Sequence, residues 1–283
     1  FLKCRGYMRM PIIIKRRMIR LSSLTIFIVL ILMVLPYVTK NEKLKISYYL
    51  NTISEPKMPY YVLNQIDPEN DGVNIYASGN YDSIKTKVIR TKAALLEEYK
   101  EPNAAKDQVL ERAGHLFTEL LLNEVIPHWY GTKWDYNGYT DVPKEGRVAC
   151  GYFVSTTLKH MGLNVNRYRL AQTYSLEAVE VLNCNKAISL SGQSQDSLVN
   201  YVESKEDGFY AIGLDSHIGF ICKKNGVAYF IHSNSLWPGT VCLELARRTG
   251  HLRFSNSLVL ANLSNNQEFI KKWVLNEEFI VTK

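Results

Sequence analysis

The sequence has few cysteines, and their spacing lacks any metal-binding or disulfide pattern. The five are Cys4, Cys150, Cys184, Cys222 and Cys242, and no two of them form a Cys-x-x-Cys pair. This spacing argues against a zinc site, and an odd number leaves at least one thiol unpaired even in an oxidising compartment. An unpaired thiol is compatible with catalysis. No other motif indicates nucleotide or metal binding, so we expect no cofactor.

Acidic residues are absent from the first forty positions, and this accounts for the basic character of the whole chain. The formal net charge is +7, but residues 1–40 carry eight basic side chains and no Asp or Glu. Removing those eight from the 34 Lys and Arg leaves 26 basic against 27 acidic residues, a net charge near −1. The positive charge is local, so it gives no argument for nucleic-acid binding.

The same forty residues have the pattern of a membrane signal. Residues 21–39 are uncharged and rich in Leu, Ile and Val, and they follow Lys15-Arg16-Arg17. An apolar helix of about 20 residues spans a bilayer, and positive charge ahead of it favours an N-inside orientation. We expect a cytoplasmic basic segment over 1–20, a transmembrane signal-anchor over 21–39, and the body of the protein in the periplasm or cell envelope.

A cleaved signal peptide is the alternative for this segment, and it would make the protein secreted. No Ala-x-Ala-like site follows the apolar run, which ends Leu35-Pro36-Tyr37-Val38-Thr39, and this favours an uncleaved anchor. A buried core helix would leave the basic flank unexplained.

Beyond residue 40 the sequence predicts helices first and strands afterwards. Residues 40–100 are expected to be a linker and accessory segment, rich in turns up to residue 82 and then either helical or extended. Apolar residues then recur at three- and four-residue steps, which predicts a long helix that begins at Pro102 and is ended by Pro127. Further helices are expected over 150–161, capped by Gly162, and over 195–204.

After Gly208 the pattern changes to short β-rich runs. Asn225-Gly226 is a strong signal for a two-residue hairpin. Helices followed by an antiparallel meander make an α+β fold, which we assign to one domain over 101–283. The expected strands cover 209–213, 218–222, 227–232 and 257–263.

Cys150 has the setting of a nucleophile. It follows a polar loop that ends Gly146-Arg147-Val148-Ala149, and it begins the predicted helix over 150–161. Backbone N–H groups and the helix dipole at such a position stabilise a thiolate, so we expect a lowered thiol pKa. A lone cysteine is more often a small buried residue, and the assignment therefore requires a base close to it.

The predicted hairpin links two of the six histidines. With Asn225-Gly226 as its loop, Gly219 lies opposite His232, and His217 lies opposite Asn234. Side chains alternate along a strand, so all four project from one face, and His232 is the diagonal neighbour of His217 across a glycine. The alternative interpretation is that the histidines lie on a solvated strand face. The apolar residues on the opposite face make this interpretation less favourable. Catalysis requires this face to meet the start of the Cys150 helix.

Four features follow one another in a fixed order along the chain. They are an aromatic Tyr-Gly loop, a cysteine at a helix start, a His-x-Gly strand and a second strand ending in histidine. The segments lie within about residues 105–264 and are Trp129-Tyr130-Gly131-Thr132, Ala149-Cys150-Gly151-Tyr152-Phe153-Val154, His217-Ile218-Gly219-Phe220-Ile221 and Phe230-Ile231-His232-Ser233. This ordered set resembles the NlpC/P60 peptidases of the papain-like superfamily. The resemblance implies a papain-like α+β fold, with the nucleophile helix packed on an antiparallel sheet.

The resemblance also implies a function. Members of this family are thiol hydrolases that cleave amide bonds in peptidoglycan stem peptides. Carried over, Cys150 is the nucleophile, His217 the general base and His232 the orienting third residue, while Tyr130 lies near the nucleophile. Asn234, on the His217 face, and Gln172, after the nucleophile helix, are further candidates for substrate or oxyanion binding.

Two observations leave the substrate open. The family's usual Asp-Cys-Ser-Gly is Ala149-Cys150-Gly151-Tyr152 here, and the loop before it is longer. A thiol acyltransferase of the same fold is therefore one alternative, and an anchored binding protein with a retired site is another, although the second predicts a missing triad member. Arg167 and Arg169 can hold a carboxylate of a peptide, but such arginines are usually solvated.

Overall fold

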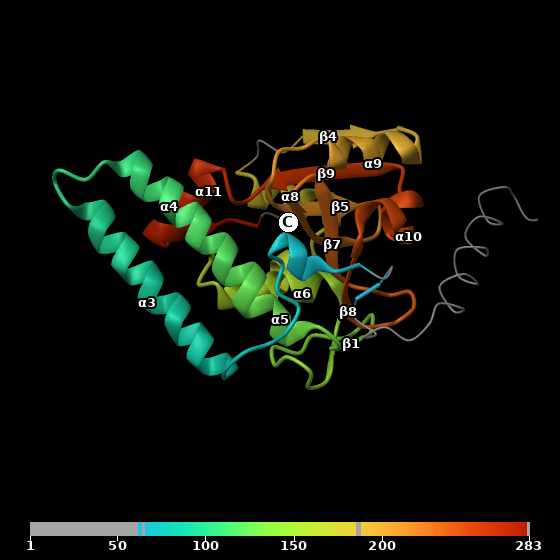
Figure 1. Ribbon diagram of the computed structural model, residues 1–283, viewed down its shortest axis with the longest axis horizontal. Helices are drawn as coiled ribbons and strands as arrows, with labels where there is room; N and C mark the ends of the chain where they lie inside the picture. The colour runs from blue at the N-terminus through green and yellow to red at the C-terminus, as the bar shows by residue number, and fades with distance from the viewer. Residues whose placement is uncertain (1–61, 64–65, 185–187, 282–283) are drawn as a thin grey trace, which may run out of the picture. The chain divides into compact units, whose positions relative to one another are not determined.

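The computed structural model describes residues 62–63, 66–184 and 188–281 of the 283-residue chain (Figure 1). The basic segment over 1–20 and the signal-anchor expected over 21–39 lie outside these described residues. Within the described part, no helix combines the length and the apolar character that crossing a membrane requires.

A six-stranded antiparallel sheet forms the centre of the domain, and helices cover both of its faces, so the predicted α+β class is confirmed. The predicted simple meander is wrong, because the strand after β8 does not continue the sheet there but returns to pair with β5. In spatial order the strands are β4 (Ile188–Ser191), β9 (Ser257–Asn262), β5 (Gly208–Leu214), β6 (Ile218–Lys224), β7 (Val227–Ser233) and β8 (Val241–Leu245).

The β6–β7 hairpin has the predicted turn and register. Asn225 and Gly226 both adopt positive φ angles, 50° and 81°, as a type I′ turn requires. Lys224 is paired with Val227, and the same register continues along the two strands. The turn residues alone therefore determine which side chains of β6 and β7 share a face.

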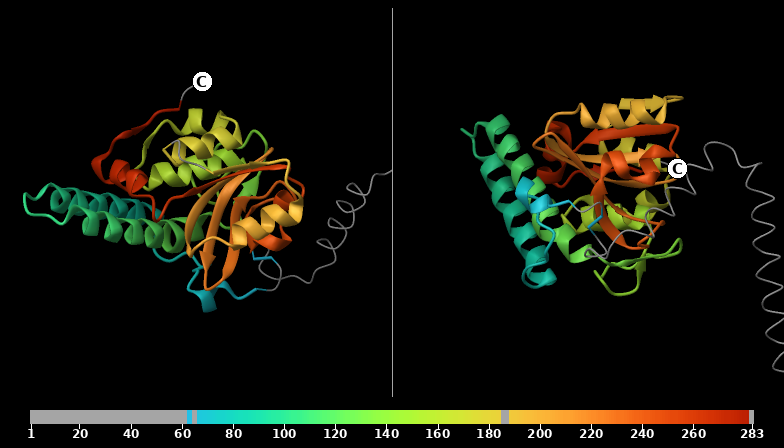
Figure 2. Two further views of the ribbon diagram at one scale, coloured as in Figure 1. Left: turned by 90° about the horizontal axis from the view of Figure 1, so that it is seen from above. Right: turned by 45° about the vertical axis from the view of Figure 1, so that its right-hand side comes forward.

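The two faces of the sheet carry separate hydrophobic clusters. Phe220 and Ile231 belong to the cluster shared with α6 (Cys150–His160) and α8 (Ser175–Leu182). Ile221 and Phe230 belong to the other, under α9 (Gln195–Glu203) and α10 (Gly250–Arg253). Figure 2 shows the yellow-green helices on one side of the sheet and the orange ones on the other.

A helical hairpin packs beside this sandwich. It consists of α3 (Tyr81–Lys100) and α4 (Lys106–Glu119), which lie side by side and contact α11 (Gln267–Leu275). The predicted helix start at Pro102 is wrong, because Pro102 lies in the turn between the two helices. The residue before a proline avoids helical angles, and Glu101 has ψ 135°, so α3 ends there.

The predicted end of the long helix at Pro127 is also wrong. The chain continues from α4 through a π-helical turn, Leu120–Val125, into α5 (Ile126–Trp129). Pro127 occupies the first turn of α5, where an N–H is not needed for helical hydrogen bonding. Because the helix changes from π to α just before Pro127, the chain stays helical through the proline.

Helix α6 begins at Cys150 and ends before Gly162, close to its predicted bounds. Gly162 has φ 75° and supplies the left-handed residue that follows a helix end. Two hydrogen bonds hold its start: the Ala149 N–H donates to the Gly138 carbonyl (2.8 Å), and the Ser233 hydroxyl donates to the Val148 carbonyl (2.8 Å). The second bond attaches the start of α6 to the end of β7.

Candidate active site

His217 and His232 come together at one end of the sheet, and Cys150 lies against the backbone of Ile218 at the same end. His217 immediately precedes β6 and His232 lies near the end of the antiparallel strand β7, so both belong to the same end. The Cys150 sulfur accepts from the backbone N–H of Ile218, the residue that follows His217. Three segments that are far apart in the sequence therefore meet there.

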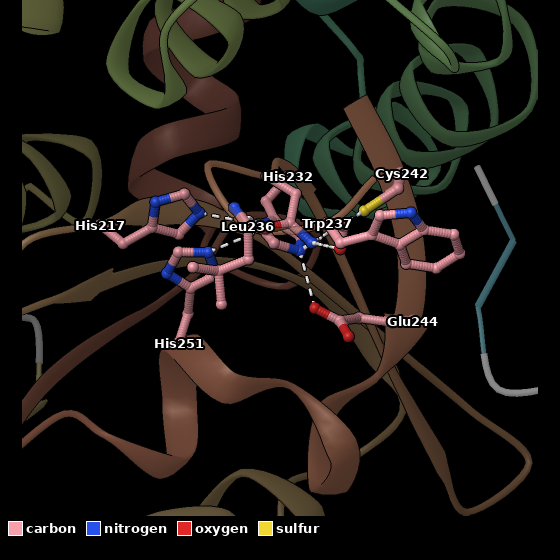
Figure 3. Close-up of polar contacts among 8 residues, drawn as sticks. His217, His232, Leu236, Trp237, Cys242, Glu244 and His251 are labelled. Carbon is pink, nitrogen blue, oxygen red and sulfur yellow. Dashed lines mark hydrogen bonds and ion pairs between the residues drawn. The ribbon is translucent and has the colours of Figure 1, made fainter. Parts of the chain in front are cut away.

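The two histidines form a buried pair. Nε2 of His217 and Nδ1 of His232 are 2.7 Å apart, and the side chains are 3% and 0% exposed (Figure 3). Gly219 lies between them, as predicted. A Cβ at Gly219 would come within 2.9 Å of the His232 Cβ and 2.6 Å of the Phe230 ring. The diagonal contact of the imidazoles therefore requires a residue without a side chain at this position.

Glu244 extends the pair, and sequence reasoning missed it. Its Oε1 lies 2.9 Å from Nε2 of His232, and the side chain is 1% exposed (Figure 3). Glu244 is on β8, a strand that the sequence analysis did not identify. Its signal was present: a single acidic residue stands in the run Val241-Cys242-Leu243-Glu244-Leu245, and a buried carboxylate nearly always has a partner.

His251 is the second residue that sequence reasoning missed. Its ring stacks on that of His217, with centroids 3.8 Å apart and planes 12° apart. It comes from α10, which lies within the connection between β8 and β9 (Figure 3). Tertiary packing alone brings α10 over the histidine pair, so no local signal pointed to it.

Asn234 holds His251 and the following loop. Its Oδ1 lies 3.1 Å from Nε2 of His251 and accepts the N–H of Leu236 (2.8 Å), while its Nδ2 donates to the Trp237 carbonyl (3.3 Å). The side chain is 1% exposed. Asn234 therefore supports the site through His251, and its predicted role in substrate or oxyanion binding stays a prediction.

Burial determines the charge state of the site. It lowers the pKa of His217 well below the ordinary value of 6.5, and the neighbouring His251 and His232 add to the effect. Burial likewise lowers the pKa of His251, with His232 as the second cause. Since desolvation disfavours a charged imidazole, His217 and His251 are neutral at pH 7.

The thiol differs from the sequence expectation. Burial raises the pKa of Cys150 above its ordinary value, and the backbone N–H groups of Ile218, Gly151 and Cys150 itself only partly oppose the rise. The residue is partly exposed, but its sulfur is packed among other atoms. The expected lowering by the helix start is therefore wrong in direction, because desolvation outweighs the helix N-terminus.

The thiol and the histidines approach from opposite faces of the sheet. Phe153 of α6 contacts Phe220 (ring centroids 5.9 Å apart), whereas His232 stacks on Phe230 (4.1 Å), which points the other way. The predicted requirement, that the His217 face meet the start of the Cys150 helix, is not met across the sheet, because α6 packs on the Phe220 face and the histidines lie on the Phe230 face. What links the two is the backbone N–H of Ile218, the residue after His217, which lies near the Cys150 sulfur.

The remaining sequence candidates are Tyr130 and Gln172, and Tyr130 lies in the core. Tyr130 is 1% exposed in the core, and burial raises its pKa well above the ordinary value, with Cys222 and Cys242 as further causes. Its neighbour Gly131 donates its N–H to the carbonyl of Val241 (2.9 Å), so the Tyr-Gly loop lies against β8. Its predicted role near the nucleophile stays a prediction.

Arg167 lines a surface cavity of about 640 Å³ beside the start of α6, and Gln172 is on the same short helix as Arg167. Gln172 donates to the Tyr152 hydroxyl (3.0 Å), two residues after the nucleophile. Arg167 donates to the Tyr139 carbonyl (3.1 Å) and the Thr156 hydroxyl (2.7 Å). The cavity is lined by Asp135, Asn137, Gly138, Tyr139, Thr140, Asp141, Gly146, Arg147, Arg167 and Tyr168.

The three histidines are close enough to suggest a metal site, since their nitrogens lie within 4.8 Å of one another. Zinc bonds to imidazole nitrogen at about 2.0–2.1 Å, which puts tetrahedral ligands about 3.3 Å apart. The 2.7 Å between His217 and His232 is a hydrogen-bond distance, and the parallel rings of His217 and His251 do not converge on one point. The arrangement fits a hydrogen-bonded chain better than a metal centre.

Comparisons of the chain with protein-family models, with curated proteins and with solved structures found no match. The functional argument therefore depends on the geometry of the site.

Proposed function

We propose that the protein is a thiol hydrolase of papain-like NlpC/P60 type that cleaves amide bonds, with peptidoglycan stem peptides as substrate and the cell envelope as its location. One observation supports this above the others. The Cys150 sulfur lies at the Ile218 N–H, next to a buried His217 that is hydrogen-bonded through His232 to Glu244. A nucleophile, a base and an oriented third group are the parts that nucleophilic catalysis requires.

The charge states favour a general-base mechanism. A thiol with a raised pKa and an imidazole with a lowered pKa form a neutral pair at rest. Nε2 of His217 is engaged by His232, so Nδ1 is the nitrogen that takes the thiol proton as sulfur attacks the substrate carbonyl. The imidazolium then protonates the leaving amine as the C–N bond breaks.

Water completes the reaction. His217 removes a proton from a water molecule that attacks the thioester, and the sulfur leaves and recovers a proton, so the enzyme is regenerated. The backbone N–H groups of Cys150 and Gly151, at the start of α6, already point at the sulfur. In the proposed mechanism they donate to the oxyanion, which forms on the carbon that the sulfur attacks.

The cavity beside α6 is the proposed substrate site. Its wall at Gly138 is hydrogen-bonded to Ala149, the residue before the nucleophile. Two arginines and two aspartates line it together with Tyr139 and Tyr168, so it offers both signs of charge and aromatic faces to a peptide. Such polar groups around a concavity provide orientation and specificity.

The test is direct. Purified protein is incubated with purified peptidoglycan, and mass spectrometry is used to find new amino and carboxyl termini. The Cys150→Ala variant should release none, whereas Cys184→Ala, which removes another partly exposed thiol, should release the same products as the parent. Products extended by an added amine would instead support acyl transfer, and binding without any new termini would support an anchored binding protein.

A further inference from the structure

We propose that Glu244 is a positioning residue that fixes the proton positions on His232 and His217, so that Nδ1 of His217 is the basic nitrogen of the site. The proposal deepens the proposed function, because it explains how the base is prepared. The proton positions themselves are a property of the resting protein and can be measured without any substrate.

The carboxylate of Glu244 determines the proton position on His232, and His232 determines that on His217. An ionised carboxylate only accepts hydrogen bonds, so Nε2 of His232, 2.9 Å from Glu244, carries a proton. When His232 is the neutral imidazole it has a single N–H, so its Nδ1 is then the acceptor. His217 Nε2, 2.7 Å from it, must then be the donor. The remaining nitrogen of His217, Nδ1, holds the lone pair.

The opposite direction of the His217–His232 hydrogen bond would leave His217 unable to act as the base. If His232 donated from Nδ1, His217 would accept at Nε2 and, being neutral, would carry its proton on Nδ1. That imidazole has no lone pair to offer a thiol. In neutral His232, an acceptor at Nε2 excludes this arrangement, and Glu244 provides that acceptor.

Glu244 also matches the charge that develops during proton transfer. When His217 takes a proton, the positive charge forms in a site that excludes water, since both histidines are at most 3% exposed. His232 can share this charge through the 2.7 Å bond, and the carboxylate at the far end of the chain stabilises it. The stacked ring of Phe230 holds His232 in the plane that allows both bonds.

The third histidine is fixed independently. Asn234 Oδ1 already accepts the Leu236 N–H, so it also accepts from His251, whose proton is therefore on Nε2. The ring stacked on His217 is thus neutral and engaged elsewhere, and it does not compete for His232. Glu244 remains the group that orders the His217–His232 bond.

The experiment is nitrogen NMR of the histidine rings in the purified, ¹⁵N-labelled full chain. Two-bond proton–nitrogen correlations distinguish an Nε2–H from an Nδ1–H imidazole. The parent protein should show His217 and His232 both protonated on Nε2. In Glu244→Gln, the amide can turn its NH₂ toward His232, and a substantial Nδ1–H population should appear at His217. Finding His217 protonated on Nδ1 in the parent protein would overturn the proposal without any variant.

Two controls keep the proposals separate. Glu203→Gln makes the same change in a surface ion pair with Arg247 and should leave both tautomers unchanged. With a peptide substrate, Glu244→Gln should lower kcat by about 10²- to 10⁴-fold with little change in KM, as expected when a base loses its tautomer. Unchanged tautomers and unchanged kcat in Glu244→Gln would refute this inference and leave the hydrolase standing. An inactive parent with the expected tautomers would refute the hydrolase alone.

Discussion

His217 and His251 stack ring on ring, with centroids 3.8 Å apart and planes tilted by only 12°. A second imidazole at this distance is a like charge whenever both rings are protonated. It therefore helps to keep His217 neutral, as the lowered pKa of His217 indicates. The stacking therefore links the protonation of His217, the candidate base, to α10, a helix outside the β6–β7 hairpin.

Acid should destabilise the protein through these buried histidines. Burial lowers the pKa of His217 and His251 in the folded state below 6.5, so the unfolded chain binds more protons at acidic pH. The stability they contribute is present above about pH 6.5 and is lost as pH falls below it, by up to about 1.4 kcal/mol per pH unit per group. Denaturant unfolding between pH 7 and pH 5 measures this loss.

His251→Phe is the variant that isolates one of the two groups. Phe keeps a ring on His217, and Asn234 Oδ1 keeps its bond from Leu236, but the titrating group is gone. The unfolding free energy should then fall less steeply between pH 6.5 and pH 5 than in the parent. An equally steep fall would show that His251 titrates normally in the folded state.

The thiol should respond to pH as a buried neutral group. Its raised pKa implies that alkylation of Cys150 by iodoacetamide, read by mass spectrometry of its peptide, continues to accelerate above pH 9.0, the ordinary thiol value. A rate that had already levelled off by pH 7 would indicate a preformed thiolate–imidazolium pair. The general-base mechanism would then be wrong, although Cys150 would remain the nucleophile.

Gly219→Ala should cost both stability and activity. The added methyl would approach the Phe230 ring, the His232 Cβ and the Ile231 carbonyl, all within 2.9 Å. Overpacking of this kind costs about 1–3 kcal/mol. Because the shift acts on His232, kcat should also fall in conditions where the variant is fully folded. A folded variant with parental kcat would show that the diagonal histidine contact is not needed.

Arg167→Ala should weaken substrate binding and leave the chemistry intact. Arg167 connects the cavity wall at Tyr139 to α6 at Thr156, so its loss should open the wall. We expect KM to rise on the order of tenfold with kcat little changed, the pattern of lost uniform binding. Arg169→Ala, an exposed arginine on the same short helix, is the matched control. Equal effects of both variants would argue for a general charge effect.

The sequence was sufficient where local signals determine geometry. Asn225-Gly226 fixed the hairpin register, and the register placed His217 diagonal to His232 across Gly219. The helix start at Cys150 followed from its apolar spacing. These features depend on a few neighbouring residues, so they can be read without knowing how the domain packs.

Tertiary packing determined the rest. Glu244 was missed because β8 was not recognised as a strand, and His251 because α10 reaches the site only through folding of the β8–β9 connection. The thiol pKa was predicted in the wrong direction because a helix start is visible in a sequence, whereas burial of a sulfur atom is not. Pro127 was misread because a π-helical turn has no sequence signature.

The division of the site between two faces of one sheet has a consequence for regulation. Cys150 moves with α6 and its hydrophobic cluster, while the histidines are held by β7, β8 and α10 in the other cluster. The halves meet at the end of the sheet, through the Ile218 N–H and the hydrogen bond from Ser233 to the Val148 carbonyl. In the proposed mechanism, a slight slide of α6 that broke these two links would separate Cys150 from His217 while both clusters stayed intact. A fully folded chain would then be inactive. An inhibitor that binds at the start of α6 and displaces it would need no contact with either histidine.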